Sequence, residues 1–276
     1  MINAVGNRMT REIARQQKLA DQIERTQIQI SSGKRLQRMS DDPVSARRIA
    51  TIGTTQASIT AWNTNINTAT ALVSQADAAL KSVSNLMTRA RELTVAAAND
   101  TTSAADRATI AAELGTIADE IDSLAATRDS NGEPVFASST ARVMRFDGDI
   151  SFAPVPAAAD VFVIAGNSLS TGIRDAAIAV AAGNKPAMGT ALTALNTAIG
   201  HVADRHAAIG LSAGRLERIG DGLAAREITL KDERSSVEDT DLSVAIAELN
   251  AQDLTLGAAQ AAFAKINRQT LFDILN

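Results

Sequence analysis

The chain has 276 residues, enough for one large or two modest domains with a real core. Its formal net charge of −4 does not favour nucleic acid as a partner, and the lack of cysteine excludes disulfides and thiolate metal sites. It contains no apolar run of the ~18 residues that suggest a membrane-spanning helix, so we expect no membrane insertion. The charged N-terminal segment does not have the form of a cleavable secretory signal.

The charge is distributed unevenly between the two ends of the chain. Residues 1–48 hold ten Lys or Arg against five Asp or Glu, whereas residues 232–253 hold seven Asp or Glu against one Arg. Opposite signs favour contact between these segments, although two solvated faces that never meet would carry the same pattern.

The first predicted element is a helix over residues 2–30 with a weak apolar face. Large apolar residues recur at seven-residue spacing and at companion positions, but Glu12, Gln16 and Thr26 dilute the stripe. The candidate packing residues of this helix are Ile2, Val5, Met9, Leu19, Ile23 and Ile30.

A polar link at residues 31–40 separates this helix from a much longer one. Gly33 lies within the link, and Ser40, Asp41 and Asp42 come directly before Pro43. Ser and Asp side chains accept hydrogen bonds from the free amides of a helix start, and Pro suits the first helical turn. The sequence therefore predicts a second helix that begins at Pro43.

Two helices of a bundle are predicted next. Apolar residues alternate steps of three and four from Leu72 to Ala97, which is typical of one buried helix face, and Asn99-Asp100 ends the pattern. Ser103 and Asp106 have the spacing of a capping box, so a further helix is expected to begin after Ser103.

Residues 128–172 predict a small β-rich insertion, because Asn131-Gly132 signals a turn and two short apolar runs flank Asp147-Gly148-Asp149. The Asp-Gly pair favours a two-residue hairpin loop. The alternation of apolar residues instead favours a three-residue loop that pairs Phe146 with Ile150. A further strand is expected at residues 161–164.

Helical periodicity returns from Met188 to Leu230, and an acidic stretch at residues 238–241 suits the start of a last helix. That helix repeats large apolar residues at intervals of seven and adds others near its end. Its candidate packing residues are Leu242, Leu249, Leu256, Phe263, Ile266, Leu271 and Ile274.

These elements predict a mainly α fold: a long antiparallel helical bundle or coiled coil, with both termini paired at one end and a small β-rich insertion at the other. The scarcity of aromatic residues, 3 % of the chain, favours slender helices over a core with a ligand cavity. Three domains are expected. Residues 1–42 with 236–276 form terminal helices, residues 43–127 with 173–235 a bundle core, and residues 128–172 an outer insertion.

We predict no catalytic residue, cofactor site or metal ligand. Gly210-Leu211-Ser212-Ala213-Gly214 has the Gly-x-Ser-x-Gly form of a nucleophile elbow, but helical pattern surrounds it and both histidines precede it, so a helix irregularity is expected instead. His201 and His206 are separated by about 140° around a helix, which prevents joint metal chelation. One of them is expected on the bundle face and the other exposed.

The terminal helices are expected to need partners. Burying the few large apolar residues of the last helix stabilises it far less than ordering its chain costs. Both ends should therefore be frayed in a monomer and ordered in an assembly, although an ordinary coiled-coil protein with mobile tails would share this property.

Three stretches resemble the flagellin superfamily of axial flagellar proteins, and most closely its hook–filament junction members. Ser32–Arg35 followed by Ser40–Pro43 is similar to the first link of junction proteins, whereas flagellins usually have Ala after the paired Asp. Asn131–Ser138 resembles the Asn-Gly-x-x-Phe-Ser-Gly entry to the insertion, with Ser139 where Gly is common. Gln269–Leu275 resembles the junction protein's Ser-Leu-Phe-Asp-type terminus.

The resemblance implies a non-enzymatic structural subunit of the bacterial flagellum that joins hook to filament and contributes to motility. It implies self-assembly through the terminal helices, with the hook-side junction protein and flagellin as further partners. It also implies an export chaperone, passage through the type III export apparatus and an extracellular location. A short filament flagellin is the nearest alternative. A secreted hydrolase built on Ser212 and a cytoplasmic coiled-coil adaptor are alternatives from other classes.

Overall fold

The computed structural model describes the backbone of residues 2–274 and the side chains of residues 9–265. The chain forms two compact units, one of residues 1–56 with 227–276 and the other of residues 57–226. We refer to them as the terminal unit and the central unit. The division into three domains stays a prediction.

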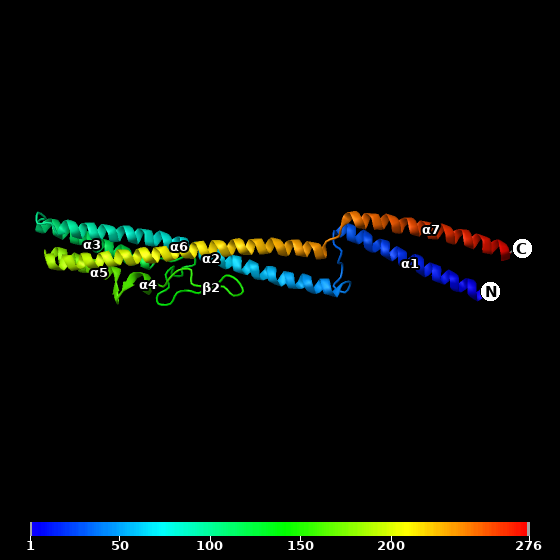
Figure 1. Cartoon of the computed structure of the whole chain (residues 1–276), viewed down its shortest axis with the longest axis horizontal. Coiled ribbons are helices and arrows are strands. Elements are labelled where there is room, and N and C mark those ends of the chain that lie inside the picture. Colours follow the sequence, from blue (N-terminus) through cyan, green and yellow to red (C-terminus); the bar gives the residue numbers. More distant parts are fainter. Residues whose placement is uncertain (1, 275–276) are drawn as a thin grey trace. The chain divides into compact units, whose positions relative to one another are not determined.

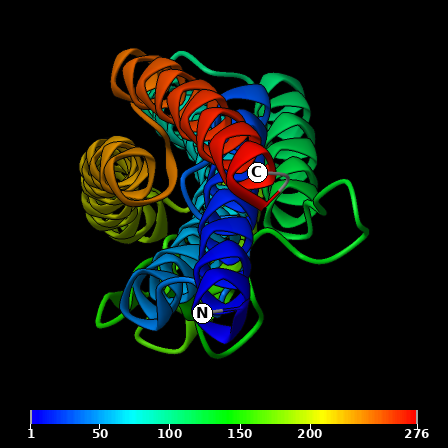
Figure 2. The same ribbon diagram turned by 90° about the vertical axis from the view of Figure 1, so that its right-hand side faces the viewer.

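The terminal unit contains α1 (Ile2–Ser32) and α7 (Leu242–Ile274), together with the first part of α2 (Pro43–Ala97) and the last part of α6 (Lys185–Glu238). Helices α1 and α7 lie side by side in both views (Figures 1 and 2). The predicted break and the predicted helix start at Pro43 are both confirmed.

The central unit is a helical bundle built from the remaining parts of α2 and α6 with α3 (Ala104–Ala125) and α5 (Leu169–Ala181). Its core follows a seven-residue repeat, which is the pattern of close coiled-coil packing. The buried residues of α6 in this repeat are Met188, Leu195, Val202, Ile209, Leu216 and Leu223. Those of α2 are Ile59, Ile66, Val73, Leu80, Met87 and Thr94. The predicted mainly α, antiparallel architecture is confirmed.

Helix α3 begins with the predicted capping box. The backbone amide of Asp106 donates to Oγ of Ser103 at 3.1 Å, and the amide of Ser103 donates to Oδ2 of Asp106 at 3.3 Å. Helix α5 ends at Ala181, and Gly183 in the connection to α6 has a φ of +64°. The apolar periodicity of the sequence did not predict that α5 and α6 are separate helices.

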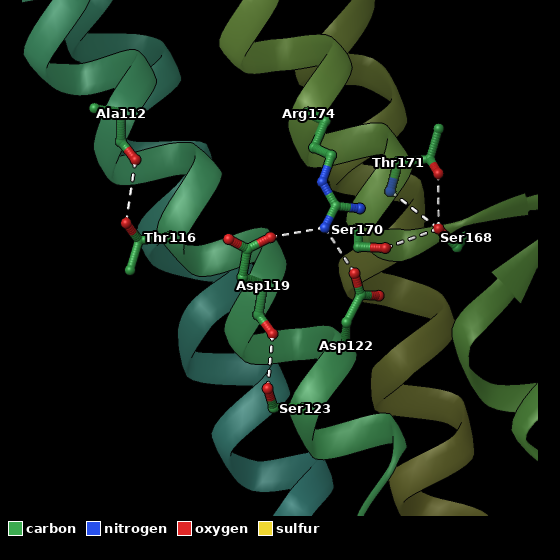
Figure 3. Close-up of polar contacts among 9 residues, drawn as sticks. All are labelled: Ala112, Thr116, Asp119, Asp122, Ser123, Ser168, Ser170, Thr171 and Arg174. Carbon is green, nitrogen blue, oxygen red and sulfur yellow. Dashed lines mark hydrogen bonds and ion pairs between the residues drawn. The ribbon is translucent and has the colours of Figure 1, made fainter.

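Helices α3 and α5 pack against each other, and one arginine joins their exposed edges (Figure 3). Nη2 of Arg174 on α5 lies 2.8 Å from Oδ1 of Asp119 and 2.7 Å from Oδ2 of Asp122 on α3. Ser168 caps α5, since its Oγ accepts from the amide of Thr171 at 3.0 Å.

The first hairpin of the insertion has the register that the apolar alternation predicted. β1 (Met144–Arg145) pairs with β2 (Ser151–Phe152), with Met144 opposite Phe152. The amide of Phe146 donates to the carbonyl of Ile150 at 2.8 Å, so the loop has three residues. Phe146 is fully buried against Phe152, with ring centroids 4.7 Å apart.

The strand predicted at residues 161–164 is wrong in its first half. Val161 and Phe162 end a short helix, α4 (Ala158–Phe162), and only β3 (Val163–Ile164) is extended, paired with β4 (Asn167–Ser168). The helix buries Val161 and Phe162 together, and the Phe162 ring meets Phe136 edge-on. A short apolar run does not distinguish helix from strand.

The helix irregularity predicted at residues 210–214 is also wrong, since α6 runs through this segment without a break. One histidine of α6 was expected on the bundle face and the other exposed, but both are partly buried and they contact different partners. Nε2 of His201 lies 2.9 Å from the carbonyl oxygen of Asp160, and Nε2 of His206 lies 2.7 Å from Oδ1 of Asp77.

Candidate assembly site on the terminal helices

The pair of α1 and α7 is only partly buried. Among the predicted packing residues, Ile23 is buried, and five are half-buried: Leu19, Ile30, Leu249, Leu256 and Phe263. Met9 and Leu242 are 41 % and 48 % exposed. The remaining predicted residues lie outside the described side chains: Ile2, Val5, Ile266, Leu271 and Ile274.

A polar contact lies inside this apolar stripe. Thr26 is buried, and its Oγ1 is 3.1 Å from the carbonyl oxygen of Gln22 and 3.3 Å from Oε1 of Gln252 on α7. Gln252 in turn donates to Oε1 of Glu248 at 2.9 Å. A buried polar pair within a helix seam favours one register over its neighbours. Thr26, which interrupts the apolar stripe in the sequence, is therefore part of the α1–α7 contact.

A second apolar set points away from the α1–α7 contact. These side chains are between 41 % and 76 % exposed, and we call them the outward set: Met9, Ile13, Ile28, Leu242, Val244, Ile246 and Leu254. Several large apolar side chains exposed on one helix pair are a surface that another protein can cover. The helix pair thus packs internally with one face and leaves further large apolar side chains exposed on its other sides.

The link after α1 is held to the end of α6 by a short backbone ladder, which we call the clasp (residues 33–35 with 237–240). The amide of Arg35 donates to the carbonyl of Glu238 at 2.8 Å, and the amide of Thr240 donates to the carbonyl of Gly33 at 2.9 Å. Gly33 has a φ of +69°, a conformation that glycine adopts without strain.

Ion pairs strengthen the clasp. Glu238 is paired with Nε of Arg234 at 2.7 Å and with Nζ of Lys34. The hydrogen bond from Arg234, followed by that from Lys34, lowers the pKa of Glu238 below its ordinary value. Arg48 of α2 also pairs with Glu233 of α6. The basic N-terminal segment and the acidic C-terminal segment therefore meet within the terminal unit.

The predicted link residues take distinct positions. Asp42 caps α2, because its Oδ1 accepts from the amides of Val44 and Ser45, both at 3.1 Å. Hydrogen bonds from the side chain and then the amide of Ser45 lower the pKa of Asp42. Asp41 instead accepts from the amide of Arg38 at 2.9 Å, and Ser40 is exposed.

The sequence pattern missed two kinds of residue in this site. It did not indicate the outward set apart from Met9 and Leu242, because a seven-residue spacing selects the residues that face the neighbouring helix in the same chain. It also did not pick out Arg35, Arg234 and Glu238 as partners, although the opposite charges of the two ends were the signal for them.

Comparison with protein families gives the relationship. Residues 3–141 match the family described as "Bacterial flagellin N-terminal helical region". Residues 192–275 match the family described as "Bacterial flagellin C-terminal helical region". The chain belongs to the bacterial flagellin family. Its members are structural proteins, so the chain is a structural component of the flagellum, and the predicted superfamily is confirmed.

Solved structures share the fold at low sequence identity. A Vibrio parahaemolyticus chain described as a flagellar hook-associated protein has 17 % identity and a TM-score of 0.65, over 72 % of this chain and 100 % of that one. Xanthomonas campestris FlgL has 15 % identity and a TM-score of 0.58, over 66 % and 98 %. The flagellar junction protein FlgL of Legionella pneumophila has 13 % identity and a TM-score of 0.55, over 71 % and 100 %.

No curated protein sequence matched the chain. Within residues 2–274, no helix has both the length and the apolar character needed to cross a membrane. The described side chains also contain no group of three or more His, Asp or Glu placed to hold a metal ion.

Proposed function

We propose that this flagellin-family chain is the subunit that joins the flagellar hook to the filament. Two observations support the junction role. The fold aligns with chains described as hook-associated and FlgL proteins, with TM-scores of 0.55 to 0.65. The link carries Asp41-Asp42-Pro43, the form that resembles junction proteins, where filament flagellins usually have Ala at the third position.

The observation that carries the assembly role is the outward set on α1 and α7. Half-buried residues such as Leu249 and Leu256 hold the helix pair together, while Val244 and Leu254 remain 60 % and 76 % exposed. Copies of the chain would cover these side chains by packing their terminal helices together. The predicted residues near the extreme ends, from Ile2 to Val5 and from Ile266 to Ile274, would extend the same contact.

The three predicted domains have separate roles in this proposal. Residues 1–42 with 236–276 would form the inner polymerisation layer, residues 43–127 with 173–235 the shell around it, and residues 128–172 the outer surface. Further partners would be the hook-side junction protein and flagellin. The chain would reach its extracellular place through the type III export apparatus with an export chaperone, and it would have no enzymatic role.

Immunolabelling of intact flagella tests the proposal. An antibody against the chain should mark a single spot at the boundary between hook and filament, and a strain that lacks the chain should retain hooks but lose attached filaments. Label along the whole filament would overturn the junction role in favour of a short filament flagellin. Absence of the chain from sheared flagella would overturn the assembly role itself.

A further inference from the structure

A basic groove lies in the central unit, between the turn after β1 and one face of α6. Its volume is about 420 Å³. Asp147 and Ile150 of the turn form one wall, and α6 forms the other with residues at three- and four-residue spacing. The α6 lining is Arg215, Arg218, Ile219, Gly222, Leu223 and Arg226.

The three arginines differ in how far their charge is compensated. Nη1 of Arg226 pairs with Oδ1 of Asp147 at 3.1 Å. Arg215 stacks over the ring of Phe152, with its guanidinium carbon 4.1 Å from the ring centroid. Arg218 is exposed, and no carboxylate among the described residues lies within ion-pairing distance of it, Asp221 included. The groove therefore carries excess positive charge centred on Arg218.

Helix α6 itself offers Arg218 no compensating neighbour at the favourable spacing. A carboxylate four residues away would pair with it, but these positions hold Gly214 and Gly222. Glycine in a helix interior is unfavourable relative to alanine by roughly 0.5–1 kcal/mol. A Cβ at Gly222 would meet nothing within 4 Å, so no packing inside the chain requires glycine there. The bare position leaves the groove floor open to the backbone of another molecule.

An acidic face lies on α3 of the same unit, beside Arg174 of α5. Asp119 and Asp122 share one guanidinium, that of Arg174 (Figure 3). Glu120, the next residue along α3 after Asp119, is exposed and forms no ion pair among the described residues. Asp119, Glu120 and Asp122 of α3 thus outnumber the single arginine that pairs with this part of the helix, which leaves an excess of negative charge.

We propose that the Arg218 groove of one copy receives the acidic face of a second copy of the same chain. The two patches have opposite charge, and both are exposed in the single chain. A contact between two different patches is heterologous, so it can repeat from copy to copy around a ring or along a helical array. The proposal rests on the self-assembly proposed above and adds a second, polar contact in the central unit to that of the terminal helices.

Charge reversal tests the pairing in the full-length chain. Arg218→Glu and Glu120→Arg should each raise the concentration needed for self-assembly by about tenfold, since like charges placed opposite each other are strongly unfavourable. The chain with both substitutions should return to within about twofold of wild type. Lys81→Glu makes the same charge change as Arg218→Glu at an exposed site on α2, and it should have no effect. Circular dichroism verifies that each variant is folded.

Disulfide trapping gives a second readout. The natural chain has no cysteine, so copies with Gly222→Cys mixed with copies with Ser123→Cys should form a mixed disulfide dimer under mild oxidation. Gly222→Cys mixed with Lys81→Cys is the matched control and should give background only. The groove proposal is overturned if neither reversal weakens assembly, if the double reversal does not restore it, or if the mixed dimer stays at background.

These outcomes are separable from those of the proposed junction role. A wild-type spot at the hook boundary with unaffected reversal variants would overturn the groove contact alone. Label along the whole filament would overturn the junction role, while the groove contact would still stand or fall on the reversal experiment, because a filament is also an array of copies.

Discussion

Lys34 in the link and Glu238 at the end of α6 form an ion pair across 204 positions of sequence. Backbone hydrogen bonds on both sides of this pair, from Arg35 to Glu238 and from Thr240 to Gly33, align the two segments as a short antiparallel ladder. The clasp therefore fixes where α1 ends relative to the start of α7. The pairing of the terminal helices begins from this fixed point.

Acidification should open the clasp through Glu238. Its pKa is lower in the folded chain than the ordinary 4.5, so its carboxylate contributes stability above about pH 4.5, and this contribution is lost as the pH falls through the folded pKa. Amide hydrogen exchange at Arg35 and Thr240 should accelerate over that range. Glu238→Gln should accelerate exchange at neutral pH and flatten its acid dependence. Glu227→Gln removes a carboxylate from an exposed pair with Lys231 and should leave the clasp unchanged.

The cap of α2 should be specific to one of the three polar residues before Pro43. Asp42→Ala removes the acceptor of the Val44 and Ser45 amides and should increase hydrogen exchange in the first turn of α2. Ser40→Ala should not, because Ser40 is exposed and outside the cap. Equal effects of the two substitutions would contradict the assignment of Asp42 as the cap.

The connection between α5 and α6 should depend on Gly183. A Cβ at this position would lie 3.3 Å from Nε and Nη2 of Arg107, and the φ of +64° disfavours other residues. Gly183→Ala should lower the free energy of unfolding by about 1–2 kcal/mol, measured by urea denaturation. Gly189→Ala is the matched control inside α6, where nothing obstructs a Cβ, and it should raise stability by roughly 0.5–1 kcal/mol. The same sign for both changes would refute this account.

The polar contact between Thr26 and Gln252 should lower the stability of the α1–α7 pair while it favours one register of the two helices. Thr26→Leu with Gln252→Leu replaces it by apolar side chains, which should strengthen the α1–α7 contact and slow hydrogen exchange in both helices. Either substitution alone should help less, because it leaves one polar group facing a leucine. If the double variant exchanges faster than wild type, the seam cannot accommodate larger apolar residues and Thr26 is required for packing.

Sequence periodicity predicted the long helices because their burial is periodic. Every seventh residue of α6 from Met188 to Leu223 is buried, so the pattern in the sequence and the packing in the structure are the same observation. Residues 161–164 are a counterexample. Four consecutive apolar residues have no period, and tertiary contacts of Phe162 with Phe136 select helix for the first two. The turn at Ala165-Gly166 was also hidden, since Ala165 takes a φ of +48° that alanine rarely adopts.

The candidate site was predictable in part. Heptad spacing indicated Ile23, Leu249 and Leu256, which the structure places in or near the contact between α1 and α7. The clasp could not be located, because net charge shows that two segments attract but not which residues meet. The exposure of the outward set could not be predicted either. The sequence does not show whether an apolar residue between two stripe positions is buried by another helix or exposed to solvent.

Assembly should depend on the outward set more than on the residues within the helix pair. Leu254→Ser with Val244→Ser removes side chains that are 76 % and 60 % exposed, so the chain should keep its fold while losing most of its self-assembly. Leu256→Ser is the contrasting variant. The Leu256 side chain is half-buried, so its removal should increase hydrogen exchange in α7 of the isolated chain. Circular dichroism and sedimentation of assembled material separate the two effects. Normal assembly of the Leu254 and Val244 variant, with intact helicity, would show that copies meet through a different face of the terminal helices.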